Sequence, residues 1–137
     1  QSYDIVQSDP RSYRWEYVDD AITLVQERST RPPNCEFRVA DPAPTAVGIA
    51  SDAGYNAGVE EISICRAVPG NGHECKLIYR VPESEFAPAE LSQTINLLDI
   101  VGWTPSDGIY WIQAKDNSGE TCNSGSLRIG GLDRTNN

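Results

Sequence analysis

The segment DGIYWIQAKDNSG at residues 107–119 constrains the fold more than any other part of the sequence. Side chains alternate between the two faces of a β-strand, and the stretch from 109 to 115 fits that period. One face is apolar, as a core requires: Tyr110, Ile112 and Ala114. The other face mixes apolar and polar side chains: Ile109, Trp111, Gln113 and Lys115. Residues 116–119 end the strand, because Asp and Asn bond to nearby backbone and Gly adopts positive φ.

A second segment, EISICRAVPGNGHECKLIYRV at residues 61–81, predicts a β-hairpin around the turn Pro69-Gly70-Asn71. With Gly70 at the centre, residues equally far from it face each other. The facing pairs are then Cys65 with Cys75, Ile62 with Ile78 and Glu60 with Arg80. Directly opposed residues lie about 4.5–5.5 Å apart, a separation that a disulfide can span. The register therefore favours a Cys65–Cys75 bridge.

The chain has four cysteines, an even number that suits two disulfides in a short protein. Disulfides form in oxidising compartments, so we expect a secreted, extracellular protein whose first residues, QSYDIVQ, are a mature N-terminus. Zinc sites usually pair cysteines two to four residues apart, and no two here are closer than ten. If Cys65 joins Cys75, the second bridge is Cys35–Cys122, although four cysteines allow three pairings.

The remaining segments predict further short strands. Three of them read as strands from their apolar, β-branched or alternating residues: 35–40, 94–101 and 126–129. Residues 15–28 fit either a helical stripe or a strand, and their β-branched residues favour the strand. Residues 45–59, rich in Gly and Ala, fit a loop or a strand with bulges. A single helical turn, with Pro88 near its first position, fits residues 82–93.

A length of 137 residues suits one domain spanning 1–137. Residues 1–14 are expected to form an arm or edge strand, and residues 130–137 a frayed tail. We therefore predict an all-β sandwich with two disulfides and at most one short helix.

Residues 94–129 resemble the E–F region of immunoglobulin-like domains. There an alternating strand leads to an Asp, a Gly and a Tyr, and the next strand ends in Ala-x-Asn/Asp before a Gly turn. The positions that carry the resemblance are Asp107, Gly108, Tyr110, Ala114, Asp116 and Gly119. The resemblance implies an immunoglobulin-like β-sandwich in which Tyr110 is a tyrosine corner, its hydroxyl bonded to backbone upstream. Antibody-type domains carry a Cys where this chain has Ile112, so their inter-sheet disulfide is absent.

The charge of the chain bears on its partners. Twenty acidic and 11 basic residues give a net charge of −9, which repels nucleic acid and anionic lipid. No apolar run approaches the roughly 20 residues of a membrane-spanning helix. We therefore expect a protein or glycan partner at a cell surface, with no nucleic acid and no membrane insertion. In size, acidity and cysteine number the chain is similar to small secreted fungal effectors and elicitors.

The sequence contains few candidate catalytic residues. His73 is the only histidine, and a Ser or Cys nucleophile would need it as its base. Its place at a hairpin tip favours an exposed surface residue instead. Two carboxylates could hydrolyse a glycoside, and the candidates are Asp19, Asp20, Glu60, Glu61, Glu83, Glu85, Asp99 and Asp107. The predicted Glu60–Arg80 pair and the turn at Asp107 favour structural roles for these two acids, so no enzyme is expected.

Two short motifs suggest a bound ion or phosphate, and neither has the required context. DNSGE at 116–120 lacks the ligand spacing of a calcium loop. PGNG at 69–72 lacks the strand, helix and Lys of a phosphate-binding loop. We therefore expect no cofactor and no metal.

Aromatic side chains are the strongest remaining candidates for binding: Trp15, Tyr17, Tyr55, Trp103 and Trp111. They could form a flat platform for sugar rings, a protein contact patch, or simply part of the core. We expect Tyr110 in the core with Trp103 beside it, and Trp111 as the aromatic most suited to face outward. The sequence favours a secreted, non-catalytic recognition protein of effector or elicitor type. The alternatives are a carbohydrate-binding module and a small glycoside hydrolase with paired carboxylates.

Overall fold

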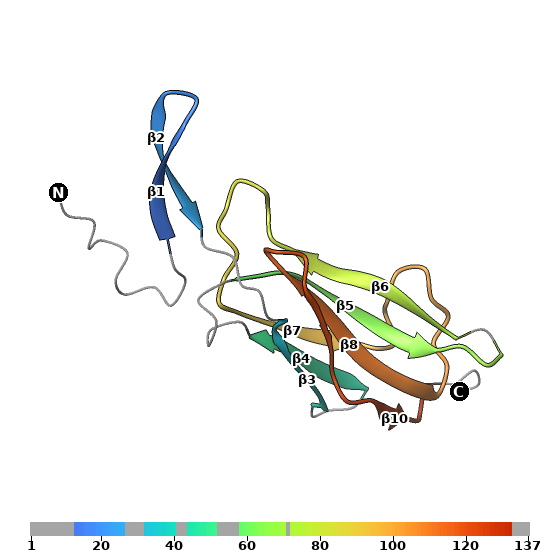
Figure 1. Cartoon of the computed structure of the whole chain (residues 1–137). Helices are drawn as coiled ribbons and strands as arrows, with labels where there is room; N and C mark the ends of the chain where they lie inside the picture. Colours follow the sequence, from blue (N-terminus) through green and yellow to red (C-terminus); the bar gives the residue numbers. More distant parts are fainter. Residues whose placement is uncertain (1–12, 27–31, 41–43, 52–57, 71, 133–137) are drawn as a thin grey trace.

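A computed structural model describes residues 13–26, 32–40, 44–51, 58–70 and 72–132. These residues form two antiparallel sheets packed as a β-sandwich, together with a separate hairpin that stands apart from the sheets in Figure 1. The predicted all-β sandwich is therefore confirmed. No part of the described chain is helical, and the expected helical turn near Pro88 is instead a turn at Pro82–Glu85 followed by irregular chain.

The larger sheet has five strands. Its order is β10-β8-β5-β6, and β9 pairs with β8 on the same side as β10. The strands are β5 (Val59–Ala67), β6 (His73–Arg80), β8 (Gly108–Asp116), β9 (Thr121–Asn123) and β10 (Leu127–Ile129). β8 and the last strand follow the sequence-based prediction, whereas β9 was not foreseen.

The smaller sheet has three strands in the order β3-β4-β7: β3 (Asn34–Val39), β4 (Thr45–Ser51) and β7 (Glu90–Asn96). β4 pairs with both neighbours without a register shift, so its Gly and Ala residues build a regular strand rather than a loop. Residues 52–57 of the same predicted segment lie outside the described residues.

The predicted strand at 94–101 is displaced toward the N-terminus. β7 ends at Asn96, whose side-chain Oδ1 accepts a hydrogen bond from the Leu98 N–H at 3.0 Å. The Asn96 carbonyl also accepts one from the Asp99 N–H at 3.0 Å. Asn therefore turns the chain in the middle of an apolar run, which pattern alone had extended as a strand.

The core lies between the two sheets. The smaller sheet contributes Phe37, Ala46, Ala50, Leu91 and Ile95, and the larger contributes Val59, Ile62, Ile64, Tyr110, Ile112, Ala114 and Ile129. The predicted core face of β8 is confirmed, because its three apolar side chains are at most 2% exposed. Gly48 of β4 lets the sheets approach, since a Cβ there would lie 2.8 Å from Ile112 Cγ2.

The predicted hairpin forms as β5 and β6, with a change of register partway. Cys65 lies opposite Cys75, as predicted, and the pairing holds as far as Ser63 with Leu77. A β-bulge then leaves Ile78 of β6 without a counterpart, so Ile62 pairs with Tyr79. The expected Ile62–Ile78 pair is therefore wrong.

The same bulge corrects the predicted ion pair. Arg80 lies opposite Glu61 rather than Glu60, and its Nε donates to Glu61 Oε1 at 2.8 Å. Lys115 Nζ lies 3.5 Å from the other oxygen of the Glu61 carboxylate. The ion pair lies in the predicted region of the hairpin, one residue away from the predicted acid.

Both predicted disulfides are present. Cys65–Cys75 joins the facing strands of the β5–β6 hairpin, with Cα atoms 4.0 Å apart. Cys35–Cys122 joins β3 of the smaller sheet to β9 of the larger, across 87 residues of sequence. The first bridge therefore staples one hairpin, and the second ties the two sheets together.

The N-terminal part of the chain forms strands, as favoured. The ambiguous segment is a hairpin of β1 (Tyr13–Val18) and β2 (Ala21–Gln26), so strand rather than helix is confirmed, but the single strand expected over 15–28 is two strands. Residues 27–28 lie outside the described residues. Asp19 and Asp20 form its turn with φ of 53° and 66°, a left-handed pair that suits two-residue hairpins. Residues 1–12 lie outside the described residues.

The prediction of a frayed tail from residue 130 is wrong at Leu132. Leu132 is 2% exposed, and its N–H donates to Asp107 Oδ1 at 2.7 Å. Leu132 therefore packs against the sandwich, whereas Gly130 and Gly131 are exposed, and residues 133–137 lie outside the described part of the chain. The side chain of Asp107 holds this segment, a long-range role that local pattern does not show.

Candidate recognition site around Trp111

Trp111 lies on the outer face of the larger sheet. Its neighbours Tyr110 and Ile112 are buried in the core, so alternation along β8 turns Trp111 to the opposite face. There it lies directly across from Cys65 of β5 and is half-buried. The aromatic that the sequence favoured as outward-facing is thus on the solvent side of the sandwich, next to the Cys65–Cys75 bridge.

A shallow pocket opens to solvent beside Trp111. Its volume is about 580 Å³, within the range of roughly 300–1,000 Å³ that is usual for small-ligand sites. Its walls come from β6, β8, β9 and the connection after β9: His73, Trp111, Gln113, Asn123, Ser124, Gly125 and Ser126. We refer to this feature as the Trp111 pocket.

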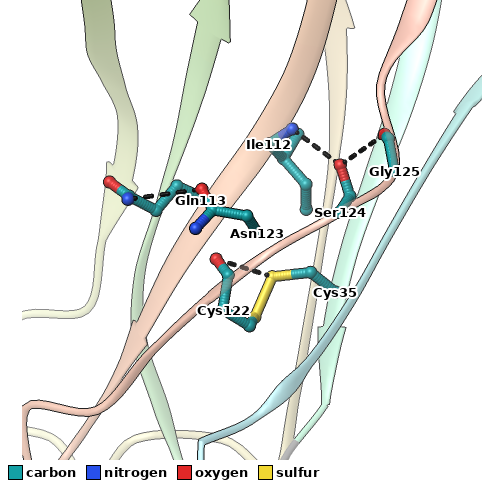
Figure 2. Close-up of a disulfide and its surroundings, with 7 residues drawn as sticks. All are labelled: Cys35, Ile112, Gln113, Cys122, Asn123, Ser124 and Gly125. Atoms are coloured by element: carbon teal, nitrogen blue, oxygen red, sulfur yellow. Dashed lines mark hydrogen bonds between the residues drawn. A yellow bond between two sulfur atoms is a disulfide. The ribbon is translucent and has the colours of Figure 1, made fainter.

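One wall of the Trp111 pocket exists because β8 changes partner along its length. β8 pairs with β9 at residues 113–115 and with β10 at residues 108–110. Between them, the Ile112 N–H donates to Ser124 Oγ at 2.9 Å (Figure 2). The Ser124 N–H in turn donates to the Ile112 carbonyl at 3.0 Å. Ser124 thus continues the hydrogen bonding of the sheet while the chain crosses from one strand to the next.

The Cys35–Cys122 disulfide fixes this wall to the other sheet. Figure 2 shows the bridge next to Asn123 and Ser124, which follow Cys122 directly in the chain. β9 is only three residues long, so its own pairing holds it weakly. The bridge to β3 therefore adds the constraint that positions the polar residues of the pocket.

The polar side chains of the pocket are amides and hydroxyls. Gln113 Nε2 donates to Asn123 Oδ1 at 3.3 Å, a long hydrogen bond between exposed groups. Within the described part of the chain this leaves Gln113 Oε1 as an acceptor and the Asn123 amide as a donor. The Ser124 hydroxyl also donates to the Gly125 carbonyl at 3.0 Å.

His73 forms the far side of the pocket as an aromatic neighbour of Trp111. Their ring centroids are 5.6 Å apart, and the planes are inclined at 55°. The His73 side chain is exposed, as expected for a hairpin end. The Ser124 and Ser126 hydroxyls line the pocket with it, and no carboxylate lies among the lining residues to orient His73 as a base.

Trp103 packs on the core side of β8, as predicted, and so does not share a surface with Trp111. Its ring lies edge-on to Tyr110, with centroids 6.3 Å apart. The Arg66 guanidinium lies 4.1 Å above the Trp103 ring and donates to Glu74 at 2.7 Å. Burial disfavours the charged form of Arg66, but hydrogen bonds to Glu74 and Tyr110 outweigh it and raise the pKa of Arg66.

Of the other predicted aromatics, those whose side chains the structure describes do not line the Trp111 pocket. Tyr17 lies on β1 and is 78% exposed. The backbone of Trp15 belongs to the same strand, opposite Leu24, but its side chain lies outside the described set. Tyr55 also lies outside the described residues. The structure therefore supports one aromatic site at Trp111 rather than a platform shared with Tyr17 or Trp103.

The candidate carboxylates serve the fold where the structure describes their contacts. Glu61 is held by Arg80 and Lys115, and Asp107 binds the Leu132 N–H. Asp116 is fully buried, and its Oδ1 accepts hydrogen bonds from the N–H groups of Ser118 and Glu120, each at 2.9 Å. The DNSG turn is thus built around the Asp116 carboxylate.

Sequence reasoning missed the residues of the β9–β10 connection. Asn123, Ser124 and Ser126 come from a polar stretch that resembles any surface loop. They line the pocket only because β8 changes partner beside them. Gln113 carried a local signal, since it shares a strand face with Trp111.

No family model matches the sequence, and neither a curated protein nor a solved structure matches it significantly. No three His, Cys, Asp or Glu side chains gather as a metal site requires within the part of the chain that the structure describes. Over the same residues, no helix is long and apolar enough to cross a membrane. The pocket itself is therefore the basis for any functional assignment.

Proposed function

We propose that this chain is an extracellular, non-catalytic recognition protein that binds a partner at a cell surface through the Trp111 pocket. The observation that carries the proposal is a partly covered tryptophan in an open pocket, ringed by hydrogen-bonding side chains. Large aromatic side chains with polar surroundings are frequent anchors of binding sites. Full burial of the Trp111 side chain would stabilise the fold more than partial burial does, so stability alone does not account for its position.

The rigidity of the frame supports the same proposal. Each side of the pocket is next to a disulfide: His73 lies two residues from Cys75, and Asn123 follows Cys122. A site that is already ordered before binding loses less conformational entropy when its partner arrives. Disulfides also fit an oxidising, extracellular setting, which is part of the proposal.

The chemistry of the lining favours binding over hydrolysis. Glycoside hydrolysis needs two carboxylates that flank the scissile bond, and the lining residues include none. The candidate acids Glu61 and Asp107 are engaged by structural partners. The lining of the Trp111 pocket therefore does not support the glycoside hydrolase alternative.

The proposed class of recognition protein rests on two likenesses. The Tyr110 hydroxyl donates to the Ser106 carbonyl at 2.5 Å, as the tyrosine corner of immunoglobulin-like domains requires, and this supports that fold family. Small size, acidity and two disulfides support a role similar to that of secreted effectors and elicitors.

The test is retention of fluorescently labelled protein on intact plant and fungal cells and on their isolated walls. We expect retention of the wild type and at least a tenfold loss for Trp111→Ala, because the variant removes the anchor of the pocket. Tyr17→Ala is the matched control, since it removes an exposed aromatic outside the pocket.

If Trp111→Ala fails to fold, Gln113→Ala tests the pocket in its place, because Gln113 lies in the pocket and outside the core. Equal retention of the wild type and both pocket variants would refute the proposal. Release of reducing sugars in the same tubes would instead revive the hydrolase.

A further inference from the structure

The lining of the Trp111 pocket has a distinctive hydrogen-bonding character. Its polar side chains, apart from His73, are two amides and two hydroxyls: Gln113, Asn123, Ser124 and Ser126. An amide offers both an acceptor and donors, and a serine hydroxyl both donates and accepts. A ligand that matches this lining must therefore donate and accept at neighbouring atoms, as adjacent hydroxyl groups do.

The amides are placed to act together. Gln113 follows Trp111 by two residues on the same face of β8, and Asn123 lies directly opposite Gln113 on β9. Their mutual hydrogen bond, 3.3 Å long, orients the two amide groups side by side. The acceptor that remains on Gln113 and the donor that remains on Asn123 can reach neighbouring hydroxyls of one ring.

Trp111 supplies the apolar part of the site. A sugar ring has apolar C–H faces and a polar rim, so it pairs with an aromatic surface that is flanked by hydrogen-bonding groups. His73, at 5.6 Å from Trp111, lengthens this aromatic surface. The pocket is shallow and open, so a chain of rings can continue beyond it on either side.

The charge of the site selects a neutral ligand. The lining has no Asp or Glu to pair with a cation and no Lys or Arg to pair with an anion. The chain as a whole carries a net charge of −9, which repels anionic saccharides.

We infer that the Trp111 pocket binds one or two rings of a neutral polysaccharide, stacked on Trp111 and hydrogen-bonded by Gln113 and Asn123. This inference rests on the proposed function, because it names the ligand of the same site.

The experiment is titration of the full chain with soluble hexasaccharides, followed by calorimetry and by tryptophan fluorescence. The neutral probes are β-1,4-glucan, β-1,3-glucan, β-1,4-xylan, β-1,4-mannan and chitin hexamers, and the anionic probe is a hexamer of galacturonic acid. We expect at least one neutral hexamer to bind and the anionic hexamer to bind at least tenfold more weakly.

Three variants locate the site. Trp111→Ala should weaken binding at least tenfold and abolish the fluorescence change, whereas Trp111→Phe should retain part of the affinity. Asn123→Ala should weaken binding five- to tenfold, because one hydrogen-bonding group is lost. Thr121→Ala is the control on the same strand, since Thr121 does not line the pocket.

The outcomes separate the inference from the proposed function. If no neutral hexamer binds while cell-surface retention still depends on Trp111, the saccharide inference is overturned and a protein partner takes its place. Neutral binding that is unchanged in Trp111→Ala would also overturn it, as would tighter binding of the anionic hexamer. If retention on cells does not depend on Trp111, the proposed function itself is refuted.

Discussion

The Tyr110 side chain connects the core with the segment of chain that leads into β8. Its ring is 1% exposed and packs beside Trp103, while its hydroxyl donates to the Ser106 carbonyl at 2.5 Å. Ser106 lies four residues earlier in the chain, so the bond fixes the turn that leads into β8. Because β8 also carries Trp111, the geometry of this corner helps to position the pocket.

We predict that Tyr110→Phe lowers the free energy of unfolding by about 1 kcal/mol or more, because a buried hydrogen bond is lost without a replacement. Urea denaturation measures the change. Tyr79→Phe is the matched control: Tyr79 is 38% exposed, and its loss should stay within about 0.5 kcal/mol. Equal midpoints for wild type and Tyr110→Phe would show that the corner bond contributes nothing.

At the scale of elements, the two disulfides act on different lengths of chain. Cys65–Cys75 closes a span of 10 residues within one hairpin, whereas Cys35–Cys122 closes a span of 87 residues between the sheets. Cross-linking restricts the unfolded chain more when the closed loop is longer. The intersheet bridge should therefore contribute more to stability than the hairpin bridge.

We predict that replacing both Cys35 and Cys122 by Ala lowers the free energy of unfolding by about 4.6 kcal/mol, against about 2.7 kcal/mol for the Cys65 and Cys75 pair, from loop-closure entropy. Urea unfolding of each double variant, with the other bridge intact, measures the difference. Equal losses would mean that the closed span does not control the stabilisation here.

For the molecule as a whole, the close approach of the two sheets decides stability. A Cβ on Gly48 would lie 2.8 Å from Ile112 Cγ2 and 3.3 Å from Ile62 Cδ1, both in the opposite sheet. Sandwich cores are close-packed, so there is little room for this extra methyl group. β4 therefore needs glycine at this position for its contact with the other sheet rather than for its backbone angles.

We predict that Gly48→Ala destabilises the protein by about 1–3 kcal/mol, the usual cost of overpacking a core. Thermal or urea unfolding checks the size of the effect. Gly108→Ala is the control in a strand, because open space surrounds the corresponding Cβ position and its stability should be unchanged or slightly raised. An unchanged free energy of unfolding in Gly48→Ala would contradict the close approach of the sheets.

Several local features could be predicted from the amino-acid sequence: the strand around Tyr110, the turn after it and the Cys65–Cys75 hairpin. Each depends on residues close in sequence, where alternation and turn chemistry act directly. Other features became visible in the folded structure alone: the bulge at Ile78, the end of β7 at Asn96 and the gathering of Asn123 and its neighbours beside Trp111. These depend on packing and on pairing between distant strands, which a local pattern does not encode.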